Sequence, residues 1–335
     1  MRNWLRKTFS LSKPELEVQA DTPAPAITSG AEALLKRLEW TTVRRLDGVL
    51  QGDYRTLFRG AGLDFADLRE YQSHDDVRHI DWNVTARTGT PHVRVFTEDR
   101  EMAAWFVMDL SASVDFGSGQ RRKRDVANEL AVSLARLLTG HGNRVGALLY
   151  GGGDGNEAAS KMLPTGYGRR HVLQLAHELL AHRAKAGSQE TQLAHLLDAA
   201  AHAIKRRSTV FVISDFFSAP GWDKPLAQLA RRHDVVAVRL TDPLELQLPD
   251  LGMITFRDAE TGQTQLVDCN PNFRRRFAEI SAEKEAQLRD GLNAAGVDTL
   301  ELSTDADIAD SLIRFAALRR GKSRRFAAMN KQKVA

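Results

Sequence analysis

The stretch of the chain that decides its fold is Trp105-Phe106-Val107-Met108-Asp109-Leu110-Ser111-Ala112-Ser113. Four bulky apolar residues are followed by one carboxylate and two hydroxyls. A short apolar run bounded by polar residues is typical of a strand buried on both faces, as in a parallel sheet. Asp109, Ser111 and Ser113 alternate, so their oxygens face one side if the loop is extended. We therefore predict a buried strand that ends in an oxygen-rich loop.

Strand and helix patterns alternate along the rest of the chain. A helical pattern begins at Arg121, beyond Gly117 and Gly119. Further strands are expected at 145–150, 161–163, 210–214, 235–240 and 298–302, a hairpin at 253–267, and helices at 171–182, 273–292 and 308–318. This alternation predicts an α/β fold with a doubly wound, mostly parallel sheet of the Rossmann-like kind.

Two later positions add oxygen atoms to those of the central loop. Thr191 opens a helical pattern, and Asp215 ends the apolar run 210–214. Ligands of α/β proteins bind at the carboxyl ends of the strands, and hard cations such as Mg²⁺ prefer oxygen ligands. We therefore predict a Mg²⁺ or Mn²⁺ site formed by Asp109, Ser111, Ser113, Thr191 and Asp215.

Purely local roles for the same side chains are an open alternative. Asp109 could accept hydrogen bonds from its own loop, and Ser111 and Ser113 could cap the helix that follows them. The three residues alone do not separate these roles from metal binding, and the metal hypothesis depends on Thr191 and Asp215 joining them.

Composition narrows the class of protein. The 335 residues carry a formal net charge of only +4, which argues against a dedicated nucleic-acid binder. The chain has one cysteine, Cys269, so no intramolecular disulfide can form. This fits a reducing compartment, and we expect a cytoplasmic protein. No stretch approaches the ~18 consecutive apolar residues of a membrane-spanning helix.

The chain divides into four predicted regions. Residues 1–30 are expected to be a disordered tail and linker, 31–100 an N-terminal accessory segment packed on the main domain, 101–318 the α/β domain, and 319–335 a basic tail. Trp4 and Leu5 among basic residues leave peripheral membrane contact as an alternative for the N-terminus. The basic tail could touch nucleic acid electrostatically, although a solvated tail is the preferred interpretation. Trp82 is expected to be buried.

The accessory segment carries the most specific family resemblance. Its aromatic, acidic and basic residues, followed directly by the central strand, resemble the bacterial family named domain of unknown function 58. The residues that carry the resemblance are Gly62, Phe65, Arg69, Tyr71, Asp75, Asp76, Arg78, Ile80, Asp81, Trp82, Thr85, Ala86 and Arg87. The resemblance covers about residues 40 to 240 and points to a branch of the family that lacks membrane helices.

The order Asp-x-Ser-x-Ser, then Thr191, then Asp215 also resembles the metal-ion-dependent adhesion site of von Willebrand factor A domains. The resemblance implies that the two serines and the threonine contact the metal and that the two aspartates act through water. It also implies one open coordination position for a partner's carboxylate.

The resemblance implies a function as well. Members of the family are commonly associated with AAA+ ATPases of the MoxR group, so we expect a metal-dependent protein–protein interaction module that serves such an ATPase or its client in assembling or activating other proteins. The alternative is a metal-dependent, phosphoesterase-like enzyme in which Asp215 assists a metal-bound water. Aspartate-nucleophile phosphatases, however, place a second aspartate where Ser111 stands here. We therefore predict that the chain is not an enzyme.

Overall fold

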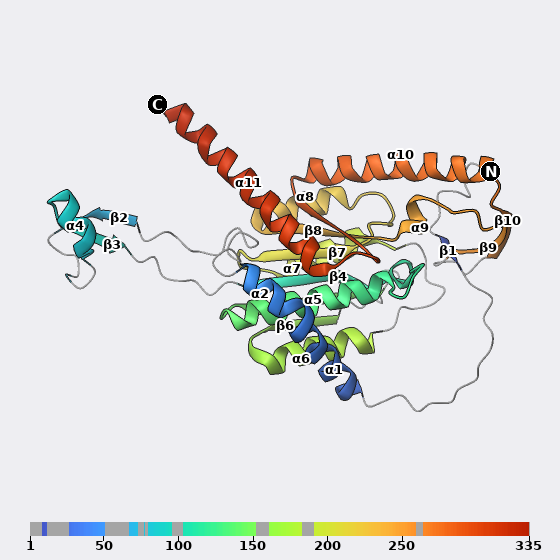
Figure 1. The fold of residues 1–335 in the computed structure, drawn as a ribbon, viewed down its shortest axis with the longest axis horizontal. Helices are drawn as coiled ribbons and strands as arrows, with labels where there is room; N and C mark the ends of the chain where they lie inside the picture. The colour runs from blue at the N-terminus through green and yellow to red at the C-terminus, as the bar shows by residue number, and fades with distance from the viewer. Residues whose placement is uncertain are drawn as a thin grey trace.

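A six-stranded sheet with the strand order β11-β8-β7-β4-β5-β6 forms the centre of the molecule (Figure 1). Its strands are β4 (Ala103–Asp109), β5 (Arg144–Tyr150), β6 (Lys161–Gly166), β7 (Thr209–Ser214), β8 (Asp234–Thr241) and β11 (Asp298–Ser303). All neighbouring strands run parallel except β6, which is antiparallel to β5. This computed structural model describes residues 9–11, 27–50, 67–72, 77, 80–95, 103–151, 161–182, 191–258 and 264–334. The predicted α/β fold with a mostly parallel sheet is confirmed.

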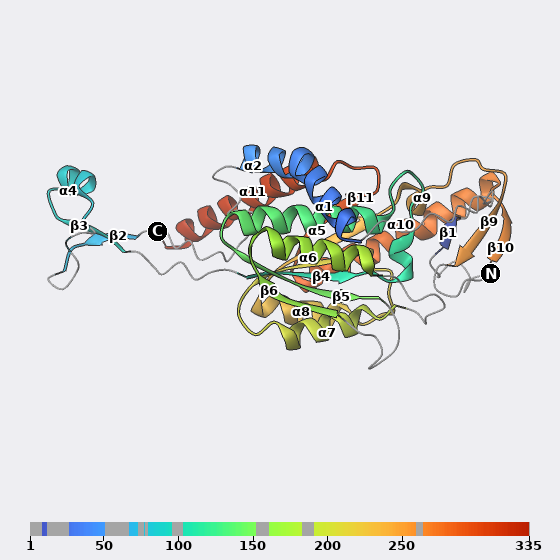
Figure 2. The same cartoon turned by 90° about the horizontal axis from the view of Figure 1, so that it is seen from below.

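Helices cover both faces of the sheet (Figure 2). One apolar cluster packs one face against α1 (Ile27–Leu38), α5 (Lys123–Gly140), α6 (Gly168–Ala181) and α11 (Ile308–Val334). A second cluster packs the other face against α7 (Leu193–Ala203), α8 (Asp223–Arg232) and α10 (Pro271–Ala295). Because side chains alternate along a strand, β4 supplies Phe106 and Met108 to the first cluster and Trp105 and Val107 to the second. This two-sided burial explains why β4 is apolar at consecutive positions.

The order of the strands reverses at β4. From β4 the chain adds β5 and β6 on one side and then returns to add β7, β8 and β11 on the other. The helix α5 that leaves β4 and the helix α7 that leads into β7 lie on opposite faces of the sheet. In open α/β sheets such a switch point leaves a crevice at the carboxyl ends of the two strands. The fold therefore places its natural ligand site between the ends of β4 and β7.

Smaller elements extend from this core. β9 (Met253–Asp258) and β10 (Thr264–Asp268) pair antiparallel, which confirms the predicted hairpin, and β1 (Phe9–Leu11) adds a third strand beside β9. The remaining elements of the main body are η2 (Glu39–Val43), α2 (Arg44–Leu50), η4 (Ala112–Asp115) and α9 (Pro243–Leu246). No helix in the described ranges has the length and apolarity required to cross a membrane.

The segment rich in family motifs folds into a strand pair and one helix. β2 (Asp67–Glu70) pairs antiparallel with β3 (His92–Val95), and α4 (Trp82–Thr88) lies between them in sequence. The buried Asp81 side chain caps α4 by accepting hydrogen bonds from the N–H groups of Asn83 and Val84. Trp82 begins the helix and is 70% exposed, so the prediction that it is buried is wrong. The capping position turns Asp81 rather than Trp82 inward.

Parts of the predicted regions lie outside the described residues, among them most of 1–30 and, in the motif segment, 62–66, 73–76, 78 and 79. The predicted packing of that segment on the main domain and the four region boundaries stay predictions. The helix α11 runs from Ile308 to Val334 without a break at 319, where the basic tail was expected to begin.

A buried arginine fastens α11 to the amino edge of the sheet. The side chain of Arg319 is 2% exposed and donates from Nη2 to Asp234 Oδ1 at 2.5 Å and from Nε to Asp298 Oδ2 at 2.8 Å. These two carboxylates stand at the starts of β8 and β11. One guanidinium therefore joins two parallel strands and the last helix.

Replacing Arg319 with alanine should destabilise the whole domain. Removing one partner of a buried ion pair leaves its carboxylates uncompensated and typically costs about 3–5 kcal/mol. Arg276→Ala is the matched control because Arg276 forms an exposed pair with Glu279, and such pairs contribute about 0–1 kcal/mol. Urea unfolding measures both changes. Equal stability of the two variants would show that Arg319 does not anchor α11.

Candidate functional site

The two strands at the switch point each end in a polar residue. Asp109 is the last residue of β4, and Asp215 directly follows Ser214 at the end of β7. The parallel register pairs Met108 with Ile213, so the two carboxylates leave the sheet side by side. Both are fully buried. The structure thus brings two of the five predicted site residues together at the position where α/β folds bind ligands.

Hydrogen bonds fix both oxygens of Asp109. Oδ1 accepts from the N–H of Ser111 at 3.0 Å, and Oδ2 accepts from the hydroxyl of Ser214 at 2.8 Å. Burial raises the pKa of Asp109 to about 6, and the charge of Asp215 adds to this increase. Asp109 therefore makes the local loop bond that the sequence left as an alternative, and it also joins β4 to β7.

The two serines of the loop form a hydroxyl pair. Ser111 Oγ and Ser113 Oγ lie 3.2 Å apart, and both residues are buried. Ser111 begins the short helix η4 but makes no side-chain capping bond, and α5 begins later, at Lys123. The capping alternative therefore does not account for the buried Ser111 hydroxyl.

Thr191 comes to the same edge of the sheet through its main chain. Its carbonyl accepts hydrogen bonds from the hydroxyl of Ser218 and from the N–H of Ala219, both at 2.9 Å. These two residues belong to the loop that follows Asp215. Thr191 is buried, and α7 begins at Leu193, two residues later than its predicted start. The assignment of the Thr191 hydroxyl as a ligand stays a prediction.

The loop after β7 has an unusual backbone. Phe216 has a φ of 59°, the left-handed region that bulky side chains rarely adopt. The turn is held by hydrogen bonds from the N–H of Phe216 to Ser214 Oγ at 2.8 Å and from the N–H of Phe217 to Asp215 Oδ1 at 3.0 Å. Such a conformation persists only where the surrounding contacts enforce it, and it is common at functional sites.

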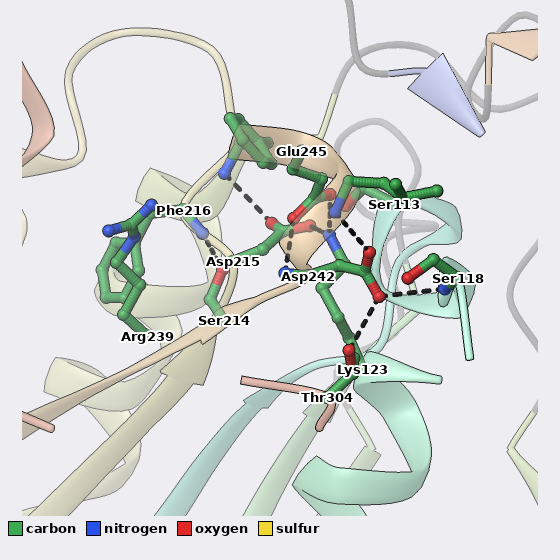
Figure 3. Close-up of polar contacts among 12 residues, drawn as sticks. Ser113, Ser118, Lys123, Ser214, Asp215, Phe216, Arg239, Asp242, Glu245 and Thr304 are labelled. Atoms are coloured by element: carbon green, nitrogen blue, oxygen red, sulfur yellow. Dashed lines mark hydrogen bonds and ion pairs between the residues drawn. The ribbon is translucent and has the colours of Figure 1, made fainter. Parts of the chain in front are cut away.

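A buried lysine, which the sequence did not identify, completes the edge (Figure 3). The ammonium of Lys123 donates to Asp215 Oδ2 and to Glu245 Oε1, each at 2.7 Å, and the lysine side chain is fully buried. Burial alone would lower the pKa of Lys123, but the charges of Asp215 and Glu245 raise it above its ordinary value. The two carboxylates therefore favour the cationic form of Lys123.

Asp242 is a further acidic residue of the site that the sequence did not identify. Asp242 Oδ2 accepts from the N–H of Ser118 at 2.9 Å and from the hydroxyl of Thr304 at 2.7 Å, and Oδ1 accepts from the N–H of Leu244 at 3.0 Å. Burial opposes ionisation, but these bonds hold the pKa of Asp242 below its ordinary value. Asp242 is also the N-cap residue of α9, and its own N–H donates to Glu245 Oε2 at 3.1 Å. This capping box holds Glu245 in position for Lys123.

The local sequence concealed these residues. Lys123 stands in the run Arg121-Arg122-Lys123-Arg124, which has the composition of an exposed helix start. Only the tertiary structure shows that Lys123 and Arg124 are the buried members of this run. The Asp-Pro-x-Glu pattern of Asp242 and Glu245 is a helix-start signal and does not indicate a site.

The arrangement fits a hard divalent cation in its donor types and its charge. Three hydroxyl-bearing residues and two carboxylate residues are buried at one edge, and such oxygens are the ligands that Mg²⁺ accepts. Lys123 contacts Asp215 and Glu245, and the charge of Asp215 acts on Asp109. These three carboxylates and one ammonium have a formal excess of two negative charges. The described ranges contain no cluster of three or more His, Cys, Asp or Glu residues that could hold a metal ion. A metal at this edge would depend on the hydroxyls.

Replacing Asp109 with asparagine should stabilise the metal-free chain at neutral pH. With a pKa of about 6 in place of 3.8, the native state binds this proton more tightly than the unfolded chain. The free energy of unfolding therefore falls as the pH rises from about 4 to about 6. Asparagine does not ionise, so the variant should exceed the wild type by up to about 3 kcal/mol near pH 7, at 1.36 kcal/mol per pKa unit. The advantage should vanish near pH 4.

Urea unfolding in chelator across this pH range measures the difference. Ser118→Ala is the control, because Ser118 is exposed and the substitution keeps the N–H that donates to Asp242. A constant difference between Asp109→Asn and the wild type at every pH would contradict the raised pKa.

Comparison with known proteins places the chain in a family. A family model described as "Protein of unknown function DUF58" matches residues 67–287, a span that contains all five predicted site residues, Lys123 and Glu245. An uncharacterized protein of Mycobacterium tuberculosis is 38% identical over 288 residues, which are 86% of this chain and 89% of the relative.

A shorter match and a solved structure add to this comparison. A Paracoccus denitrificans protein described as an uncharacterized protein in the moxR 3′ region is 30% identical over 99 residues, 29% of this chain and 94% of the relative. The crystal structure of the conserved hypothetical protein BatB from Bacteroides thetaiotaomicron aligns with a TM-score of 0.42 and 12% identity, over 66% of this chain and 99% of its own. The family model and the mycobacterial relative each extend over most of the chain, and the chain therefore belongs to the DUF58 family, as its motifs predicted.

Proposed function

We propose that this chain is a metal-dependent protein–protein interaction module with a von Willebrand factor A-like adhesion site. The observation that carries the proposal is the convergence of buried oxygens at the switch point. The 3.2 Å hydroxyl pair of Ser111 and Ser113 and the adjacent carboxylates of Asp109 and Asp215 lie at the carboxyl ends of β4 and β7.

The hydrogen bonds of the site favour different roles for its hydroxyls and its carboxylates. Both oxygens of Asp109 and both oxygens of Asp215 already accept a protein hydrogen bond. The two serine hydroxyls are bonded to one another, and the Ser111 side chain also bonds to Asp109. Ser111, Ser113 and Thr191 are therefore the proposed direct ligands of Mg²⁺ or Mn²⁺, and the two aspartates supply charge around them. A cation held in this way would offer an open position to a carboxylate on a partner.

A MoxR-type AAA+ ATPase, or a client of that ATPase, is the proposed partner. The supporting observation is the relative whose name places it in the moxR 3′ region of Paracoccus denitrificans. Genes that lie together often encode proteins that act together. We propose a binding rather than a catalytic role, because the charged residue that contacts Asp215 is a fully buried lysine held by two carboxylates, which is a structural arrangement and not a general base.

Divalent cations should stabilise the folded chain. Binding to the native state alone raises the free energy of unfolding by RT ln(1 + [L]/Kd), which is about 1.4 kcal/mol at ten times Kd. We expect the melting temperature to rise with Mg²⁺ or Mn²⁺ in the wild type and in the control Ser118→Ala. The increase should be lost in Ser111→Ala/Ser113→Ala. The metal-site hypothesis would be rejected if neither cation changed the melting temperature up to millimolar concentration and calorimetry detected no binding.

Capture of the partner should depend on the same hydroxyls. Purified MoxR-type ATPase from the same organism is passed over the immobilised chain with Mg²⁺ present throughout. This keeps the ATPase itself in one state while the chain is varied. Wild type and Ser118→Ala should retain the ATPase, and Ser111→Ala should lose at least tenfold in affinity, because a cation held by one fewer ligand no longer presents its open position to a carboxylate.

Two outcomes would count against this mechanism. Equal retention by wild type and Ser111→Ala would place the binding surface elsewhere on the chain. Turnover of a phosphate ester by the isolated wild type, absent in Ser111→Ala, would favour the phosphoesterase alternative.

A further inference from the structure

Lys123 is a fully buried cation in contact with the proposed site. Its side chain is fully buried, and its ammonium lies 2.7 Å from both Asp215 Oδ2 and Glu245 Oε1. The rings of Phe116 and Phe217 enclose it, with centroids 5.8 and 5.4 Å from the ammonium nitrogen. The buried ammonium is therefore enclosed by carboxylate partners and aromatic rings.

Such an arrangement is not required for stability. Burying an ammonium removes its hydration, and well-packed apolar residues in place of a buried ion pair are often neutral or stabilising. The chain nevertheless provides dedicated support for the pair. Glu245 is held by the capping box with Asp242, and its carbonyl accepts a 2.8 Å hydrogen bond from Ser281 of α10. A buried charge that is supported in this way is expected to affect the chemistry of the side chain that it contacts.

The group beside it is one of the five site residues. Asp215 receives the ammonium on Oδ2 while its Oδ1 accepts from Phe217. A divalent cation at the site and the ammonium of Lys123 would draw on the negative charge of the same carboxylate. Because the surroundings are buried, their mutual repulsion is weakly screened.

We propose that Lys123 is a built-in competitor that keeps the divalent-cation affinity of this site low. The inference rests on the proposed function and deepens it. With Lys123 in place, Asp109, Asp215 and Glu245 retain an excess of two negative charges. This excess attracts one divalent cation but does not hold it tightly. A partner's carboxylate supplies the missing negative charge, so the cation binds more tightly when the partner is present.

Two substitutions change the charge of the site in opposite directions. Lys123→Met removes the competing cation and leaves an apolar side chain of similar length among the phenylalanines. We expect Mn²⁺ to bind at least tenfold more tightly, equivalent to about 1.4 kcal/mol. Glu245→Gln removes one negative charge and keeps the ammonium on Asp215, so Mn²⁺ should bind at least threefold more weakly.

The double variant Lys123→Met/Glu245→Gln is the matched control. It restores the net charge of the wild-type site and removes the whole ion pair, which avoids leaving Glu245 buried without a partner. If charge is the cause, its Mn²⁺ affinity should return to within about threefold of the wild type, on the scale where 1.4 kcal/mol is tenfold. Each variant is first shown to be folded by its cooperative thermal transition in chelator.

Titration of each folded protein with Mn²⁺, followed by the electron paramagnetic resonance signal of free Mn²⁺ and by calorimetry, decides the question. Tighter binding by Lys123→Met than by the wild type supports the proposal. Weaker or equal binding by folded Lys123→Met overturns it and makes Lys123 a support that holds Asp215 in place.

Glu245→Gln keeps the proposal falsifiable if Lys123→Met does not fold, because unchanged Mn²⁺ affinity in Glu245→Gln overturns the electrostatic competition on its own. Absence of binding in all four proteins up to millimolar Mn²⁺ overturns the metal site itself and with it this inference. If the wild type binds Mn²⁺ and neither Lys123→Met nor Glu245→Gln changes the affinity, only the role of Lys123 is overturned.

Discussion

The parallel pairing of β4 with β7 is the constraint on which the site depends. Its register sets Met108 beside Ile213 and delivers Asp109 and Asp215 to the same edge of the sheet. The hydrogen bond from Ser214 to Asp109 then ties the two strand ends together. Because the connections from these strands lie on opposite faces, no helix closes the crevice between them. The geometry of the site follows from strand order before any side chain is considered.

Charge balance organises the layer around this edge. Three acidic residues are enclosed at the ends of β4, β7 and β8, and each accepts hydrogen bonds from protein donors. Asp242 receives only neutral donors and stays ionised, whereas Asp215 shares a lysine with Glu245. Removing charged groups from water is costly, so a protein that gathers them in this way is expected to use them. In this interpretation the buried ammonium and a divalent cation are alternative means of balancing the same carboxylates.

The DUF58 family match spans residues 67–287, which include Asp109, Lys123, Asp215 and Glu245 but not Thr304, a partner of Asp242. The strained backbone at Phe216 and the buried hydroxyls of Ser111 and Ser113 are features that packing alone does not require. The exposed Trp82, by contrast, belongs to the small unit of β2, α4 and β3. Its exposure makes it a candidate for contact with another molecule rather than a part of the core.

The sequence by itself determined the fold class, the central strand and the loop of alternating oxygens. Burial on both faces gives a strand a continuous apolar run, and the abrupt change to polar residues marks where that run ends. It also determined the family, through motifs in the segment before β4. It did not reveal Lys123, because a lysine among arginines at a helix start has the composition of a solvated surface whether or not it is enclosed. Nor did it reveal that Trp82 is exposed, since an aromatic residue beside an acidic one gives no sign of which of the two turns inward. Only the tertiary structure decided these points, because burial of a charge depends on which distant carboxylates, here Asp215 and Glu245, the folded sheet brings within 2.7 Å of it.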